Sequence, residues 1–228
     1  IATKINAKHR LFSKKWKGDV FSNLQFVQRN FSPIERLYTI EFDRDWNSSA
    51  VLSGQQRYWV SGLKMSLPDK GILNYQFEKL DYAEKFSGNR HLVQADFKLQ
   101  KWTIQNQGSY LNSDSNSSTS QFLRNQSQIR FHHKKNWIGS SFRLEDNQEK
   151  VKTTNQLSGL SQRFSEYGFV TGRGDSTKVF VELGYLKRTN DSLQNGILQK
   201  VNHSHTYRFN SKLIQTQKSD LSIFANYR

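Results

Sequence analysis

The 228-residue sequence contains no cysteine and only two prolines. Without cysteine the chain cannot form disulfides, zinc–thiolate sites, iron–sulfur clusters or a thiol nucleophile. It has no run of about 18 apolar residues, the length that a membrane-spanning helix requires. It also lacks a Gly-x-Ser-x-Gly elbow and a glycine-rich phosphate loop. We therefore predict that the protein is not an enzyme and binds no cofactor.

Hydrophobic residues are scarce, at 35% of the chain, and a two-layer sandwich needs more of them to fill its core. Aromatic residues nonetheless reach 13%, whereas disordered chains are poor in them. This balance is typical of strands that bury one face and expose the other face to water. We predict a single β domain over residues 1–228. Because the chain starts at Ile1 without an initiator methionine, we interpret it as a fragment of a longer chain.

Alternation of apolar and polar residues with a period of two recurs along the chain and predicts β-strands. One face of the stretch 91–99 would hold His91, Val93, Ala95, Phe97 and Leu99. Several such stretches have about ten residues or more, as tilted membrane-spanning strands do. We therefore predict an all-β fold, an antiparallel up-and-down meander of long strands that is part of an outer-membrane β-barrel.

Turn-forming residues separate the expected strands. Residues 68–71 (PDKG) predict a turn because proline presets φ and glycine accepts a positive φ. Residues 134–136 predict a tight hairpin. Further turns are predicted at residues 87–89 and 190–192. We expect longer polar loops at residues 112–120 and 145–155.

Aromatic residues recur near the ends of the expected strands. Trp and Tyr prefer the boundary between lipid and water, although aromatic residues are also frequent in other strands. The predicted interface aromatics are Trp16, Trp46, Trp59, Trp102, Trp137, Tyr185 and Tyr227. Lys79 and Lys101 follow apolar residues, and at the middle of a membrane they would count against a barrel.

The formal net charge of +15 suits nucleic acid, an anionic membrane surface or an acidic substrate. The basic residues are spread along the strands and mostly alternate with aromatic residues. A nucleic-acid binder needs both on one face, so we do not expect nucleic acid. We expect outer-membrane lipid or lipopolysaccharide as a partner, with other subunits or the rest of the same chain. The alternative is a soluble basic β domain that binds a polyanion, nucleic acid or anionic polysaccharide.

Three carboxylates, Glu41, Asp43 and Asp45, would share one face of a strand. They could bind calcium or act as the acid and base of a hydrolase. Same-face positions lie about 7 Å apart, however, whereas calcium ligands usually come from a curved loop. We therefore predict a ladder of ion pairs with neighbouring Arg and Lys residues. His203 and His205 also share a face, but no acidic residue accompanies them, and we predict no metal site.

The most distinctive segment is FSPIERLYTIEFDRDWN at residues 31–47. It resembles a stretch of large, mostly uncharacterised β-rich outer-membrane proteins of the Bacteroidota, and residues 172–196 have a similar character. The two segments cover about a fifth of the chain. The resemblance implies an outer-membrane or cell-surface location in a Gram-negative bacterium, and no activity. Together with the strand pattern, it leads us to predict a non-enzymatic barrel section with a structural, transport or secretion-assembly role.

Overall fold

The structure is a computed structural model that describes residues 2–13, 15–29, 46, 55–83, 85–158, 161–174, 180–194, 196–215 and 220–227. These residues form the strands β1 (Ala2–Phe12), β2 (Lys17–Val27), β3 (Gln56–Leu67), β4 (Gly71–Tyr82), β5 (Phe86–Leu99), β6 (Trp102–Ser115), β7 (Ser118–His133), β8 (Asn136–Val151), β9 (Gln162–Gly174), β10 (Phe180–Gln194), β11 (Ile197–Gln215) and β12 (Asp220–Tyr227). In the described part of the chain, no helix is long and apolar enough to cross a membrane.

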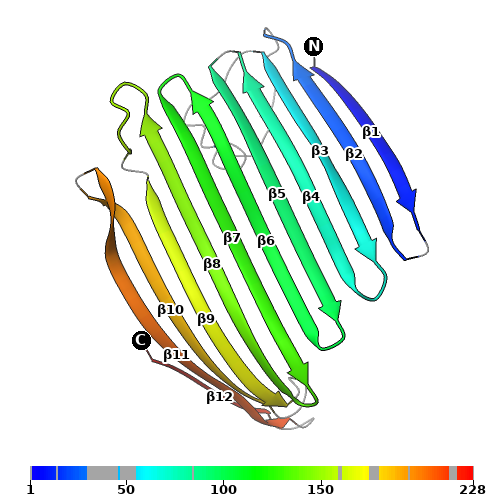
Figure 1. Cartoon of the computed structure of the whole chain (residues 1–228), viewed down its shortest axis with the longest axis vertical. Helices are drawn as coiled ribbons and strands as arrows, with labels where there is room; N and C mark the ends of the chain where they lie inside the picture. Colours follow the sequence, from blue (N-terminus) through cyan, green and yellow to red (C-terminus); the bar gives the residue numbers. More distant parts are fainter. Residues whose placement is uncertain are drawn as a thin grey trace.

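The strands form one open sheet of twelve, in which each strand pairs antiparallel with the next along the chain (Figure 1). β1 and β12 are the two edges of this sheet. The predicted all-β, antiparallel up-and-down meander is therefore confirmed. Most strands have 11 or more residues; β7 and β8, near the middle, have 16 each.

Two stretches that we predicted as polar loops are largely strand. Residues 112–115 end β6 and residues 118–120 begin β7, so only two residues connect them. β8 likewise continues through residues 145–151. Both predictions were wrong because a polar run was equated with a loop. The pairing of strands depends on main-chain hydrogen bonds, which polar side chains do not prevent where both faces of the sheet are wet.

The two ends of the sheet differ in their connections. At one end, called the short-turn edge, every connection has five residues or fewer: 13–16, 68–70, 100–101, 134–135, 175–179 and 216–219. The turns predicted at 68–71 and 134–136 are both found here. Asp69 and Lys134 take positive φ values of 59° and 54°, and Gly71 has a φ of 141°. The opposite end, called the long-connection edge, carries the longer segments 28–55 and 152–161.

The other two predicted turns are wrong. Residues 87–89 lie within β5, where Gly88 serves close packing: a Cβ there would come within 2.9 Å of the Trp46 ring. Residues 190–192 lie within β10, at a register shift between Asn190 and Asp191 in the pairing with β11. Such a β-bulge uses the same small polar residues as a turn, which explains the error.

Directly paired residues lie on the same side of a sheet, so the register gives the molecule two continuous faces. On one, called the apolar face, Ile104 of β6 pairs with Ile129 of β7. On the other, called the polar face, Gln107 pairs with Gln126 across the same two strands. Each strand thus contributes alternate residues to both faces.

A small buried cluster lies on the polar face near the long-connection edge. Its buried members are Trp46, Leu80, Tyr82, Phe86 and Leu111. Tyr58 and Phe122 pack against it, and the Trp46 ring meets Tyr58 and Phe86 edge to face, with centroids 6.3 and 6.4 Å apart. At this place packed side chains exclude water from the polar face.

Candidate functional site

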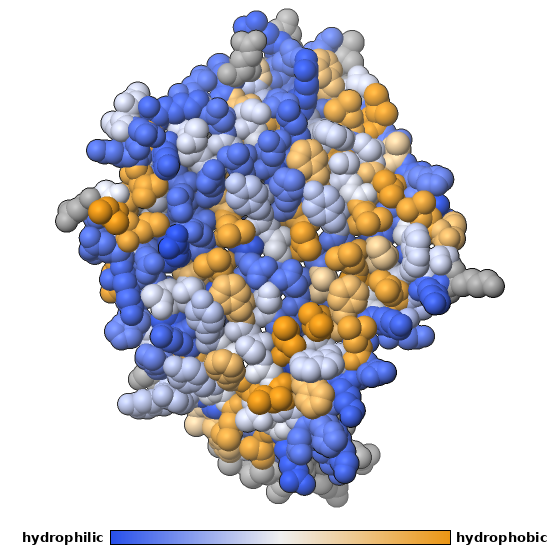
Figure 2. Space-filling view, viewed as in Figure 1, coloured by the Kyte–Doolittle hydropathy of each residue, from blue (hydrophilic) through white to orange (hydrophobic). Residues whose placement is uncertain are grey.

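The apolar face carries large hydrophobic side chains that no second layer covers in the part of the chain that the structure describes. Trp59, Tyr75, Val93, Ile129 and Phe169 are between 37% and 60% exposed. In Figure 2, hydrophobic side chains gather in a band across the middle and lower part of the sheet, and hydrophilic ones predominate toward the upper left. Apolar surface of this extent marks contact with a partner or with a membrane.

Polar side chains within the apolar face bind to one another. The Trp59 Nε1–H donates to Ser22 Oγ at 2.8 Å. Asn106 Nδ2 donates to Ser127 Oγ at 2.7 Å, and Ser127 Oγ in turn donates to Asn125 Oδ1 at 2.8 Å. Polar groups need such internal partners where water is not available to bind them.

Two lysines that counted against a membrane face lie at its margins. Lys79 is next to the long-connection edge, with its Nζ 3.9 Å from the Asp81 carboxylate. Lys101 lies in the two-residue turn between β5 and β6, at the short-turn edge. From such positions the ammonium groups reach water while their stems lie along apolar surface. Neither of these two lysines lies in the middle of the apolar face.

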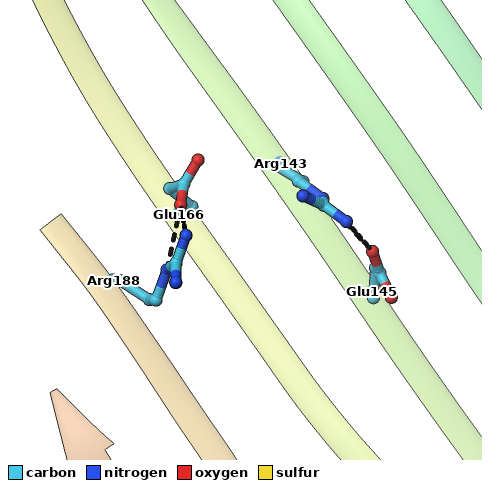
Figure 3. A network of polar contacts seen from close by, with 4 residues as sticks. All are labelled: Arg143, Glu145, Glu166 and Arg188. Atoms are coloured by element: carbon cyan, nitrogen blue, oxygen red, sulfur yellow. Dashed lines mark hydrogen bonds and ion pairs between the residues drawn. The ribbon is translucent and has the colours of Figure 1, made fainter. Parts of the chain in front are cut away.

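The polar face carries paired carboxylates over the middle strands. Glu166 Oε2 accepts two hydrogen bonds from Arg188, from Nε at 3.0 Å and Nη2 at 2.7 Å, and Arg143 Nη2 lies 2.6 Å from Glu145 Oε1 (Figure 3). A third ion pair, Arg90–Glu78, is longer at 3.8 Å, and only 6% of the Glu78 side chain is exposed. Cations outnumber the carboxylates that could neutralise them on this face.

Basic and aromatic side chains meet at several points of the polar face. The guanidinium groups of Arg143 and Arg188 both lie 5.2 Å from the centroid of the Phe164 ring, and Arg130 lies 5.0 Å from Trp137. The expected separation of basic and aromatic residues onto opposite faces is therefore incomplete. The two rings are half-buried under these cations, a favourable cation–π arrangement.

A groove of about 540 Å³ crosses the polar face from β3 to β8. One cross-strand row of side chains, here called the amide row, crosses it from strand to strand: Lys64, Asn74, Gln94, Gln107, Gln126 and Arg143. Each member is directly paired with the next on neighbouring strands. Arg90, Arg124 and Glu145 line the groove beside the row.

The amide row escaped the sequence analysis. Its glutamines lie in the middle of consecutive strands. Nothing in the local sequence indicates that they are directly paired with one another across those strands. Only the register of the pairing brings Gln94, Gln107 and Gln126 into line. A search for Gln or Asn at the mid-point of each expected strand could have found the row.

The predicted interface aromatics are divided between the faces. Trp59, Trp102, Tyr185 and Tyr227 belong to the apolar face by register. Trp102 is 47% exposed and its ring lies 4.9 Å from that of Phe131 at the short-turn edge. These four side chains lie on the face that the prediction requires, and their position at a membrane boundary stays a prediction.

The other predicted aromatics lie elsewhere. Trp16 is in the connection between β1 and β2 and contacts Gly18. The prediction is wrong for Trp46, whose side chain is fully buried, and Trp137 lies on the polar face beneath Arg130. Proximity to a strand end does not determine the face on which an aromatic ring lies, because that depends on the parity of its position.

The predicted ion-pair ladder of Glu41, Asp43 and Asp45 lies outside the described residues. His203 and His205 do share a face, with ring centroids 5.9 Å apart, and His205 Nδ1 lies 2.8 Å from the Tyr185 hydroxyl. Over the described ranges, no three His, Asp or Glu side chains gather in a way that could hold a metal ion.

The geometry thus defines the class of this chain as an open, amphipathic antiparallel sheet with one apolar and one polar face. Comparisons with protein-family models, with curated proteins and with solved structures found no match. The function is therefore inferred from the two faces themselves.

Proposed function

We propose that this sheet is a section of the wall of an outer-membrane β-barrel, non-enzymatic, with a structural, transport or secretion-assembly role. The observation that carries the proposal is the continuous apolar face, which is exposed on one side of a sheet whose other side is wet. Lipid would cover the apolar face, and the polar face would line the interior of the barrel.

The dimensions of the strands support this proposal. A membrane-spanning strand needs about 9–11 residues, tilted across the hydrocarbon layer. In β7, the nine residues from Leu123 to Phe131 form a stretch of that length, and alternate side chains of this stretch lie on the apolar face. β7 and β8 continue beyond it toward the long-connection edge, where strands of outer-membrane barrels extend into the outside medium. The short-turn edge would then face the periplasm.

The two outermost strands, β1 and β12, favour contact with further strands. In the described structure, β1 and β12 each pair on one side only, which leaves main-chain donors and acceptors free on the other side. Such groups cannot stay unpaired at membrane depth, so further strands must cover them. We propose that these strands come from the rest of the same chain or from another subunit.

Charges at the long-connection end of the apolar face support contact with lipopolysaccharide. Lys79 and Lys150 belong to this face by register and lie near the long-connection ends of their strands. Ammonium groups at that height could bind the phosphates of lipopolysaccharide headgroups.

The second candidate is a soluble domain that binds a polyanion, and the cationic groove of the polar face favours it. It leaves the exposed apolar face without a role, whereas the barrel section accounts for both faces. We therefore place it second.

The test uses the position of single tryptophans relative to lipid. Two variants of the chain, refolded into vesicles, would each keep one tryptophan, Trp102 on the apolar face or Trp137 on the polar face, with the others changed to phenylalanine. Lipids brominated in their acyl chains quench fluorescence on contact. We expect the quenching of Trp102 to exceed that of Trp137 by about twofold or more, because only the Trp102 ring would touch lipid.

Iodide dissolved in the buffer quenches fluorescence from the water side. We expect it to quench Trp137 more strongly than Trp102. Equal quenching of both tryptophans by brominated lipid, or a chain that stays monomeric in buffer without detergent or lipid, would overturn the proposal.

A further inference from the structure

The groove on the polar face has the chemistry of a binding site. We propose that the amide row and its flanking arginines bind an acidic oligosaccharide, a linear molecule rich in hydroxyl groups that carries carboxylates. This inference deepens the proposed function, since the groove would lie on the water-filled side of the barrel wall.

The shape of the row suits an extended ligand. Neighbouring strands lie about 4.8 Å apart, so the five steps from Lys64 to Arg143 span about 24 Å. The row is straight because the pairing between β3 and β8 has no register shift. One side chain per strand therefore presents a polar group at a regular interval, close to the length of one sugar residue in an extended chain.

The middle of the row has hydrogen-bonding capacity to spare. Gln107 and Gln126 are exposed, and no side-chain hydrogen bond joins either to another described residue. Asn74 donates to Gln94 Oε1 at 3.3 Å, and Gln94 donates to Asp96 at 2.9 Å, which leaves part of each amide unused. A side-chain amide both donates and accepts, as a sugar hydroxyl does, so such a row matches a polyhydroxylated ligand.

The excess of positive charge in the groove favours an anionic ligand. Four cations line it, Lys64, Arg90, Arg124 and Arg143, against the single carboxylate of Glu145. Arg143 is paired with Glu145 at 2.6 Å and Arg90 with Glu78 at 3.8 Å. Arg124 is exposed beside the amide row and has no ion pair with a described residue. A guanidinium group binds a carboxylate through two parallel hydrogen bonds, which makes Arg124 the anchor for the acidic group.

The lining favours a sugar acid over a nucleic acid. Proteins that bind single-stranded nucleic acid stack its bases on aromatic rings along a basic groove. The described lining of this groove contains no aromatic residue. The cation–aromatic pairs that involve residues of this groove use rings that are already covered, as Phe164 is by Arg143 and Arg188 and Phe21 is by Lys64.

The experiment measures binding of an oligogalacturonate of about five sugars to the whole chain refolded in detergent, by titration calorimetry. We expect saturable binding that weakens with salt, and binding at least about tenfold weaker for the methyl-esterified oligomer, which keeps its hydroxyls but loses its charges. We expect oligodeoxythymidylate of similar length to bind at least about tenfold more weakly than the acidic sugar, since it offers few hydroxyls and finds no stacking surface.

Two variants locate the site. Arg124→Gln should weaken binding of the acidic oligomer about tenfold, whereas the matched control Lys187→Gln, which removes one charge from the opposite face, should leave it unchanged. Gln107→Ala combined with Gln126→Ala should reduce the preference for the acidic sugar over the oligonucleotide. Circular dichroism would verify that each variant keeps its strands.

No binding by the unaltered chain, equal losses in Arg124→Gln and Lys187→Gln, or equal affinity for the esterified oligomer or the oligonucleotide would each overturn the inference. Its outcome is separate from that of the membrane test. Binding without lipid quenching would leave the groove as a site on a different kind of protein, and quenching without binding would leave the barrel wall without this ligand.

Discussion

The two faces of this sheet are built from the same strands yet satisfy their polar groups differently. On the apolar face, the polar side chains of Asn106, Ser127 and Asn125 bind one another. On the polar face, Gln107 and Gln126 point to solvent without such partners, and charged groups form pairs around them. The proposed function accounts for the contrast at these positions, since lipid would cover the first face and water the second. Three pairs of variants test this contrast, beginning with the pair that has the largest expected effect.

The buried cluster should be the most sensitive place in the molecule. Leu80→Ala is expected to cost about 2–5 kcal/mol of unfolding free energy, because Leu80 is fully buried against Trp46 and its neighbours and the change leaves a cavity. Leu123→Ala on the apolar face should cost no more than about 1 kcal/mol in vesicles, because lipid chains can fill the space. Urea titration of the protein in vesicles measures both values. Equal costs would mean that Leu123 packs against protein instead of lipid.

A charge should distinguish the two faces at neighbouring positions of β6. Ile104→Arg puts a guanidinium group into the apolar face and is expected to cost about 2–4 kcal/mol at membrane depth. Gln105→Arg, one residue further on, places the same group on the wet face and should change stability by less than about 0.5 kcal/mol. The same titration applies. If Ile104→Arg is as harmless as its neighbour, the apolar face is not in contact with hydrocarbon.

The smallest effect is expected from the ion pairs of the polar face. Arg188→Gln breaks the two hydrogen bonds to Glu166 and should cost about 0.5–1 kcal/mol, since water at this face screens the pair. Lys152→Gln, whose partner Asp114 is exposed at the long-connection edge, should cost close to nothing. A loss of several kcal/mol for Arg188→Gln would show that the polar face is much drier than an open interior surface.

The sequence predicted some features correctly and others wrongly for identifiable reasons. Alternation predicted the strands and their order, and residues 68–71 and 134–136 predicted two turns, because both signals depend only on neighbouring residues. The glycine at position 88 and the polar run at 112–120 were misinterpreted as turn and loop. Gly88 makes room for Trp46, a residue more than forty positions away, and no local pattern carries that information.

The candidate site also depends on information that no local sequence pattern carries. The cations and amides of the groove are visible in the sequence one at a time, and their even spread suggested a solvated face without a site. Their alignment depends on the register of five successive strand pairs.

The amino-acid sequence by itself determined that this chain forms long antiparallel strands with one oily and one wet side, because side chains alternate along any extended backbone. The tertiary structure decided which residues stand level with one another, and therefore that Arg124 lies beside a row of amides and that Trp46 is buried instead of interfacial. Register is a property of paired strands, set by packing and main-chain hydrogen bonds between distant segments, and no single strand contains it.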